Sequence, residues 1–353
     1  MKQSIDGKNR IFFGLGTIGR DMFYTMVSMY VLFYITEVRI VSDATLAGMT
    51  ALLFILRTFD AFNDPLMGLV VDNTYSRFGK FKPWILLGGL VGGVCMVLMF
   101  TDLGLSGTMY IVMFGVFYVA WDIFYGLNDI AYWSMMPSLT TDQRTREKIG
   151  SFARICANIG MFAVVVGIIP LTGALSDAVG NPKQGWMLFA VIVTVLMMAF
   201  LLFPLLGVRE RKGYFRQEEK TTLKGMFHVL VKNDQLMWVT VSLSLFMIGY
   251  TTTTSFGLYF FKYAFGNEDM YAVFALVLGV SQITALAVFT KVRTLISRRR
   301  LYSWATLLVV AGYLLFFVAP MDMAWLGVAG ILIFVGQAFI EMLMLMFLTD
   351  TIE

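Results

Sequence analysis

Long apolar runs separated by short polar stretches follow one another along almost the whole chain. A helix needs about 20 mainly apolar residues to cross the hydrocarbon core of a bilayer. No stretch between these runs is long enough for a soluble domain, so the pattern predicts an all-α integral membrane protein. The ten predicted spans are 11–38, 43–72, 83–101, 107–137, 149–174, 185–207, 234–264, 268–290, 302–320 and 322–350.

Lysine and arginine residues are concentrated in every second loop of this map. The loops on the side of the N-terminus hold 21 of the 27 basic residues, and the opposite loops hold Arg39, Lys183 and Lys262. Basic residues accumulate in the cytoplasmic loops of membrane proteins. The bias therefore predicts a multi-pass protein of the cell (inner or plasma) membrane with a cytoplasmic N-terminus, and it supports the number of spans.

The composition narrows the classes of function. Hydrophobic residues make up 58% of the 353 residues and charged residues 14%, against about 25% charged residues in soluble domains. His228 is the single histidine, and the chain contains neither H-E-x-x-H nor a recognisable nucleophile–base pair, which argues against an enzyme. We expect no bound cofactor, no nucleic acid partner, and a monomer embedded in the lipid bilayer.

The longest polar stretch, 208–233, follows the sixth predicted span. Six helices, a charged loop and further helices are the layout of a transporter built from two six-helix halves. We therefore expect an N-terminal six-helix bundle at 1–207, a cytoplasmic central loop at 208–233 and a C-terminal bundle at 234–353. Only four predicted spans follow the loop, so we expect a truncated chain with ten of twelve helices.

Charged residues inside the predicted spans are the main candidates for function. Arg57, Asp60 and Asp64 fall at i, i+3 and i+7 and so share one helical face. A charge at the bilayer centre costs roughly 2.5–3.5 kcal/mol on insertion scales, so these residues need partners or a purpose. Acids outnumber arginines, which predicts a site for H⁺ or for Na⁺, a hard cation that prefers oxygen ligands. The alternative is ion pairing that only fixes helix packing. The other charged residues within spans are Arg20, Asp21, Asp122, Asp129, Arg154 and Glu341.

The fourth predicted span carries a face suited to a sugar. Tyr125, Asp129 and Trp133 are spaced by four residues and therefore lie on one side of a helix. An aromatic ring stacks on the C–H face of a sugar while the sugar hydroxyls donate to a carboxylate. The alternative for both aromatic residues is ordinary bundle packing or a place in the interfacial aromatic belt.

A short basic turn joins the second and third predicted spans. Gly68, Asp72, Arg77, Gly79 and Lys80 form G-x-x-x-D-x-x-x-x-R-x-G-K. A glycine at position 68 permits close helix approach, and we expect Asp72 to pair with a basic residue in one conformation and to release it in another. The pattern predicts a gating motif, and the alternative is a generic basic anchor.

These residues resemble the loop motif of the major facilitator superfamily. More narrowly, D-A-F-N-D-P-L-M-G together with F-G-K-F-K-P-W is similar to the glycoside–pentoside–hexuronide:cation symporter family, in a melibiose-permease-like form. F-G-x-G-x-x-x-R-D, N-D-I-A-Y-W-S-M-M-P and the final T-D-T-I-E support the resemblance at consistent spacing. It implies a twelve-helix major facilitator fold with two helical-bundle halves, working by alternating access.

The resemblance also implies roles for single residues. Two departures stand out: Gly126 lacks the oxygen ligand that a threonine supplies in melibiose permease, and Glu341 stands where a sugar-site tryptophan is expected. The implied cation site is Asp60, Asn63, Asp64 and Asp129, of which the three acids are the metal ligands if the ion is Na⁺. The implied sugar site is Asp21, Arg20, Tyr125, Asp129, Trp133 and Arg154.

The sequence therefore predicts a symporter, driven by Na⁺ or H⁺, that imports a glycoside, a pentoside or a hexuronide. Its partners are a small sugar, a monovalent cation and the bilayer. Two alternatives stay open at this point, namely a lysolipid carrier of the same fold and a non-transporting membrane sugar sensor.

Overall fold

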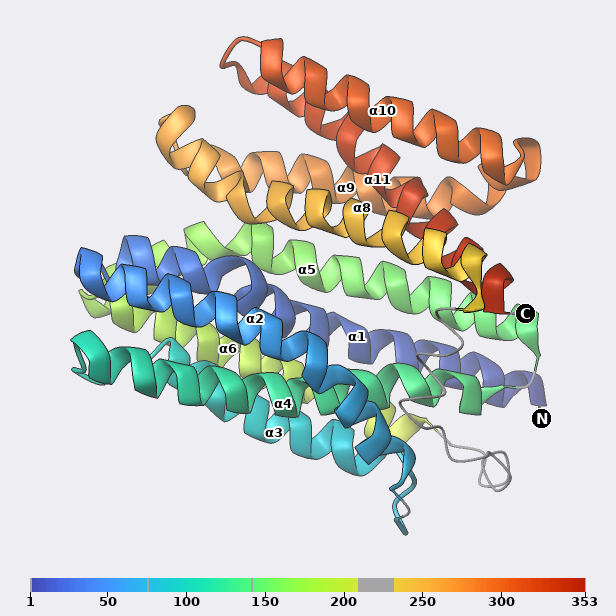
Figure 1. Cartoon of the computed structure of the whole chain (residues 1–353), viewed down its shortest axis with the longest axis horizontal. Helices are drawn as coiled ribbons and strands as arrows, with labels where there is room; N and C mark the ends of the chain where they lie inside the picture. Colours follow the sequence, from blue (N-terminus) through green and yellow to red (C-terminus); the bar gives the residue numbers. More distant parts are fainter. Residues whose placement is uncertain (1, 75, 141, 209–231, 353) are drawn as a thin grey trace. The chain divides into compact units, whose positions relative to one another are not determined.

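The computed structural model describes residues 2–74, 76–140, 142–208 and 232–352, and every regular element within these ranges is helical (Figure 1). Short π-helical segments, η1 (Tyr34–Val38), η2 (Phe203–Gly207) and η3 (Phe260–Ala264), extend three of the long helices. The long helices are α1 (Lys2–Phe33), α2 (Asp43–Asp72), α3 (Lys82–Met99), α4 (Gly107–Leu139), α5 (Gln143–Val179), α6 (Pro182–Leu202), α8 (Asp234–Tyr259), α9 (Met270–Leu295), α10 (Arg298–Val318) and α11 (Met323–Ile352).

These helices follow the predicted order. α2 occupies the predicted range 43–72, whereas α1 begins at Lys2 rather than at residue 11 and α5 begins at Gln143 rather than at residue 149. Polar residues continue a helix beyond its apolar run, so hydropathy alone places such ends too far inside the element.

Fewer helices meet the criteria of spanning length and apolar composition than the ten spans predicted from the sequence. Among the described residues, eight helices are long and apolar enough to cross a bilayer, and α2 is a ninth if its two bent parts form one span. α1 is not in this set, and it carries Arg20 and Asp21 near its middle. The all-α membrane fold is confirmed.

The chain divides into two compact units, and each is described by itself. The first unit comprises residues 1–164 and 171–220, and the second comprises residues 165–170 and 221–353. In the second unit, α9, α10 and α11 enclose an apolar core that includes Phe289, Ala305 and Leu343. All of the predicted site residues lie in the first unit.

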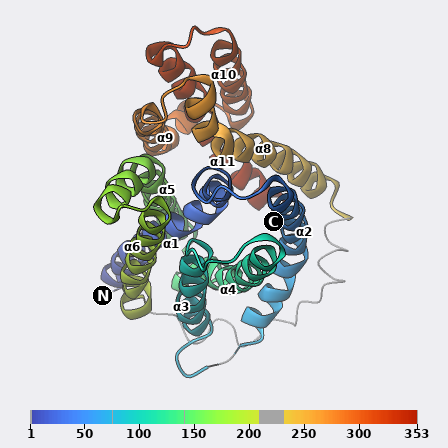
Figure 2. The same cartoon turned by 90° about the vertical axis from the view of Figure 1, so that its left-hand side faces the viewer.

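Glycines bring the helices of the first unit close together. α3 and α4 lie side by side (Figures 1 and 2), and a Cβ at Gly88 would collide with the carbonyl oxygen of Phe124. A Cβ at Gly160 in α5 would likewise collide with the carbonyl of Ile18 in α1. Small residues permit such backbone contact between membrane helices. At Gly68, where the sequence predicted a close approach, a Cβ meets no described atom within 4 Å.

A charged network in the first unit joins two loops to the start of α6. Arg39 donates from Nη1 to Asp102 Oδ1 at 2.6 Å and from Nη2 to the Leu105 carbonyl at 2.5 Å. Lys183, at the start of α6, donates from Nζ to Asp102 Oδ2 at 2.8 Å. The hydrogen bond from Lys183, together with those from the Gly104 N–H and Arg39, lowers the pKa of the Asp102 carboxyl from its ordinary 3.8 to about 2.

Candidate functional site

The first group of predicted site residues lies at a bend in α2. The helix axis turns by 41° between Asp60 and Asn63. Pro65 accounts for the bend, because it has no N–H to donate to the carbonyl of residue 61 and its ring crowds that carbonyl. Asp60, Asn63 and Asp64 are therefore carried on an interrupted helix, a feature that transporters use at their ion sites.

Asp60 and Asn63 face Asp122 of α4. Asn63 donates from Nδ2 to Asp122 Oδ2 at 3.3 Å, and the Asp60 carboxyl group lies near that of Asp122. Arg57 has its Nη1 atom 3.7 Å from Asp60 Oδ2. The structure thus brings Asp122, a lesser candidate from the sequence, into the same group as Asp60 and Asn63.

Asp64 lies on the exposed side of α2, opposite Gly126 of α4. A Cβ at Gly126 would lie 3.7 Å from Asp64 Oδ1. A side chain at position 126 would therefore contact this carboxylate, and glycine does not.

The second group is centred on Arg20 of α1 and Asp129 of α4. The two side chains form an ion pair in which Arg20 is 1% exposed and Asp129 is 42% exposed. Arg20 also donates from Nε to Asn128 Oδ1 at 2.8 Å, and its guanidinium lies 4.1 Å from the centre of the Tyr132 ring. Arg20 thus supports Asp129 from the protein interior, and the carboxylate stays accessible.

Asn128 and Tyr132 are the site residues that sequence reasoning missed. Asn128 is wholly buried and donates from Nδ2 to the Ile85 carbonyl at 2.6 Å. The Tyr132 hydroxyl donates to the carbonyl of Phe13. A guanidinium has five N–H donors, so a buried arginine requires more acceptors than one carboxylate provides. That requirement is the signal by which Asn128, next to Asp129, could have been found.

Trp133 and Arg154 form the rim of this second group. The Arg154 guanidinium lies 5.8 Å from the Trp133 ring centre, and Phe13 contacts the same ring edge-on at 6.0 Å. Both residues are half-buried, as is Asp21, whose backbone carbonyl accepts a hydrogen bond from the Thr25 hydroxyl at 2.6 Å. The structure therefore leaves part of the Trp133 and Arg154 side chains accessible.

Tyr125 differs from Asp129 and Trp133, with which it shares one face of α4. It is buried, and its ring stacks on Trp121 at 5.4 Å and on Tyr24 at 5.5 Å. In this structure aromatic neighbours therefore cover the ring on which a sugar was expected to stack, whereas Asp129 and Trp133 remain partly accessible.

The basic turn between α2 and α3 forms the predicted acid–base contact. Lys80 Nζ lies 3.0 Å from Asp72 Oδ1. Gly79 has φ of 110°, a backbone conformation that other L-residues rarely adopt. The Ser76 hydroxyl donates to the Gly79 carbonyl at 2.8 Å and shapes the turn, while Arg77 is exposed and lies over the Phe78 ring at 5.0 Å.

The acids of the two groups are not gathered into one metal site. Within the described ranges, no group of three or more His, Cys, Asp and Glu side chains is placed to hold a metal ion. The role of Asp60, Asp64 and Asp129 as Na⁺ ligands stays a prediction. Glu341 is half-buried in α11 of the second unit, and the T-D-T-I-E side chains and the segment 209–231 lie outside the described residues.

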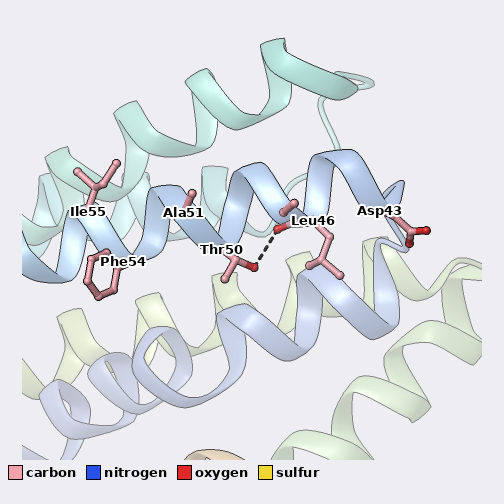
Figure 3. A pocket seen from close by; sticks show the side chains of 7 residues that line it. Asp43, Leu46, Thr50, Ala51, Phe54 and Ile55 are labelled. Atoms are coloured by element: carbon pink, nitrogen blue, oxygen red, sulfur yellow. Dashed lines mark hydrogen bonds between the residues drawn. The ribbon is translucent and has the colours of Figure 1, made fainter.

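A hollow of about 790 Å³ lies elsewhere, along the first half of α2 (Figure 3). It contains none of the predicted site residues, and its lining is almost wholly apolar. Thr50 uses its hydroxyl to donate to the carbonyl of Leu46 at 2.9 Å, which leaves no donor for a ligand. The lining residues include Asp43, Leu46, Thr50, Ala51, Phe54 and Ile55.

A family model described as MFS/sugar transport protein matches residues 12–353. The chain belongs to this family. The match confirms the resemblance to the glycoside–pentoside–hexuronide symporters of the major facilitator superfamily, which are transporters and not enzymes.

Curated relatives of this chain include a lactose permease and a raffinose carrier protein. A lactose permease of Lactobacillus delbrueckii subsp. bulgaricus is 33% identical over 355 residues, which cover 98% of this chain and 57% of the permease. A raffinose carrier protein of Pediococcus pentosaceus is 29% identical over 359 residues, 98% of this chain and 56% of the carrier. The chain therefore spans little more than half the length of these relatives.

Solved structures support the fold independently. A crystal structure of a D-xylose-proton symporter aligns with a TM-score of 0.68 at 16% identity, over 94% of this chain and 80% of that symporter. At this identity the likeness establishes the major facilitator fold alone.

Proposed function

We propose that the protein is a cation-coupled sugar symporter that imports a glycoside, a pentoside or a hexuronide by alternating access. The observation that carries the proposal is the Asp129 carboxylate, which buried Arg20 holds in place while 42% of its side chain stays exposed. Membership of a sugar transport family, and relatives named lactose permease and raffinose carrier protein, support the same function.

In the proposed sugar site, Asp129 and Asp21 accept hydrogen bonds from sugar hydroxyls and Arg154 donates to sugar oxygens. The accessible part of the Trp133 ring stacks on the C–H face of the sugar. Arg20 has a different task, because it is 1% exposed and its contacts are to Asn128, Asp129 and Tyr132. We assign it to orienting the Asp129 carboxylate.

The proposed coupling ion is H⁺ or Na⁺, and it is a second substrate of the carrier. Asp60, Asn63 and Asp64 at the bend of α2 supply oxygen atoms for it, and Asp122 adds a carboxylate beside Asn63 at 3.3 Å. Cation binding at α2 and sugar binding at α4 are coupled through contacts between these helices. Such coupling amounts to about 1–3 kcal/mol in typical carriers, and sugar must tighten cation binding by the same factor.

The proposed orientation has the N-terminus in the cytoplasm of a cell that carries the protein in its inner or plasma membrane. The concentration of lysine and arginine in alternate loops supports it. The Asp72–Lys80 contact then lies on the cytoplasmic side, where its formation and release would accompany closing and opening of that side.

Uptake into membrane vesicles tests the proposal. A panel of glycosides, pentosides and hexuronides is offered with a Na⁺, Li⁺ or proton gradient imposed separately. We expect uphill accumulation of one sugar class with one ion gradient. Asp64→Cys should abolish accumulation while sugar binding survives, whereas Asp177→Asn, an exposed acid of α5, should keep both activities. Unchanged uphill uptake in Asp64→Cys would contradict the cation site, and binding without any accumulation would indicate a sensor.

One observation favours a second candidate, a lysolipid carrier of the same fold. The hollow along α2 is lined by apolar side chains such as Leu46, Phe54 and Ile55, which suit an acyl chain better than a sugar. The same vesicles distinguish the two candidates: movement of a labelled lysolipid between leaflets without uptake of any sugar would support the second candidate.

A further inference from the structure

Lys82 makes a contact that the proposed function has not used. It is the first residue of α3, two positions after Lys80, and it is half-buried. Its Nζ atom donates to the carbonyl of Leu205 at 2.8 Å and to the carbonyl of Val208 at 2.8 Å. Leu205 belongs to η2 and Val208 follows it, so one ammonium group joins the basic turn to the end of α6.

Helix electrostatics favour this contact over a general anchoring role. A cation at the start of a helix is unfavourable and a cation at the end of a helix is favourable. Lys82 stands at the start of α3, but its ammonium group binds carbonyls at the end of η2, which is the negative end of a helix. An ordinary basic anchor would instead extend toward lipid headgroups or water.

The end of η2 is itself held firmly by α1. The Phe12 and Phe203 rings lie 5.9 Å apart, and a Cβ at Gly207 would collide with the Phe12 ring. Val208 is 1% exposed. One acceptor of Lys82 therefore belongs to a buried residue and the other to a half-buried residue, Leu205, in a segment that packs against α1.

The two lysines of G-K-F-K thus have separate partners. Lys80 pairs with Asp72 at the end of α2, within the turn itself, and Lys82 binds the end of α6. We propose that Lys82 is a positioning residue of the transport cycle, which links the basic turn to the end of α6 so that the two move together. This inference rests on the proposed transport function and adds a residue to its gating motif.

The test compares Lys82→Met, Lys82→Arg and the parent protein, with Lys148→Met, at an exposed lysine of α5, as the control. A cysteine placed at Leu206, which is 81% exposed in η2, reports the state of this segment through its rate of reaction with a hydrophilic maleimide. Three quantities are measured: the maximal rate of sugar uptake, the dissociation constant for the sugar, and the change in labelling rate on adding sugar.

We expect Lys82→Met to lower the maximal uptake rate by about tenfold, as suits the loss of charge-assisted hydrogen bonds, with a dissociation constant within about twofold of the parent. The sugar-dependent change in labelling at position 206 should disappear in Lys82→Met, persist in Lys148→Met and return in Lys82→Arg. A purely structural lysine would lower thermal stability, sugar affinity and uptake rate together.

The inference is overturned if Lys82→Met keeps the parental uptake rate, or if sugar leaves labelling at position 206 unchanged in the parent. The second outcome is measured without any substitution of Lys82. The inference can therefore be tested even if Lys82→Met does not fold. A parent protein that neither binds nor accumulates any sugar would overturn the proposed function, and the inference with it. Active parent and active Lys82→Met proteins would overturn the inference alone.

Discussion

Arg20 is 1% exposed, and the carboxylate of Asp129 with which it pairs is 42% exposed. The ion pair is therefore asymmetric, with its cation inside the protein and its anion at an accessible surface. Loss of either partner leaves the other uncompensated, but water can solvate only one of the two remaining charges.

This asymmetry predicts unequal effects of breaking the pair. Asp129→Ala should lower the free energy of unfolding by about 3 kcal/mol, because a buried guanidinium remains without its counter-ion. Arg20→Met should cost less, because Asp129 can be hydrated, yet it should weaken sugar binding since the carboxylate is no longer oriented. Thermal unfolding and sugar binding of the two variants test this. Equal destabilisation by both substitutions would contradict this prediction. Arg57→Met serves as the control for loss of an arginine, because the Arg57 side chain is 48% exposed.

A second prediction concerns Asp122. Its carboxylate accepts a hydrogen bond from Asn63 at 3.3 Å, so we expect Asp122→Asn to weaken coupling-ion binding more than sugar binding. The apparent affinity for the ion in vesicle uptake should fall by about tenfold, while the sugar dissociation constant measured without a gradient changes little. Asp177→Asn should leave both quantities unchanged. An Asp122→Asn variant with parental ion dependence would remove Asp122 from the cation group.

A third prediction concerns acid stability. The Asp102 carboxyl has an ordinary pKa of 3.8 and a pKa of about 2 in the folded protein, chiefly because Lys183 hydrogen-bonds to it. The ionised form favours the fold, so its contribution to stability is present above pH 4 or so and is lost as the pH falls toward about 2. Asp102→Asn should remove this part of the acid dependence of thermal unfolding.

Lys183→Met is the complementary variant for the network at Asp102. It removes the largest cause of the lowered pKa, so the acid-dependent loss of stability should be smaller than in the parent and should be complete at a higher pH. Identical acid profiles for Lys183→Met and the parent would show that the Gly104 N–H and Arg39 suffice to hold the carboxylate.

A fourth prediction uses the contrast between two glycines. A Cβ at Gly88 would collide with the Phe124 carbonyl, whereas a Cβ at Gly68 meets no described atom within 4 Å. Gly88→Ala should therefore destabilise the protein by about 1–3 kcal/mol, as overpacking does. Gly68→Ala should be neutral or stabilise by up to about 1 kcal/mol, since alanine is the better helix former. Thermal unfolding of the two variants gives the comparison, and a stable Gly88→Ala protein would mean that α3 and α4 separate easily.

The sequence by itself determined the helical map and the family. Apolar runs of spanning length were sufficient, because each membrane helix must satisfy its backbone hydrogen bonds within itself and so is encoded locally. The acids of α2 and α4 were identifiable for a related reason: charged residues are costly in an apolar run and are seldom placed there without a purpose.

The tertiary structure decided which of these side chains meet. Helical spacing puts Tyr125 and Asp129 on one face of α4, but it cannot show that Trp121 and Tyr24 cover the Tyr125 ring. Nor can it show that Arg20 is buried behind Asp129, that Asn128 belongs with Arg20, or that Asp122 belongs with Asn63. These contacts join residues that are far apart in the chain, and they depend on how closely α1, α2, α3 and α4 approach one another. That approach is set by packing at positions such as Gly88, and local sequence periodicity carries no information about it.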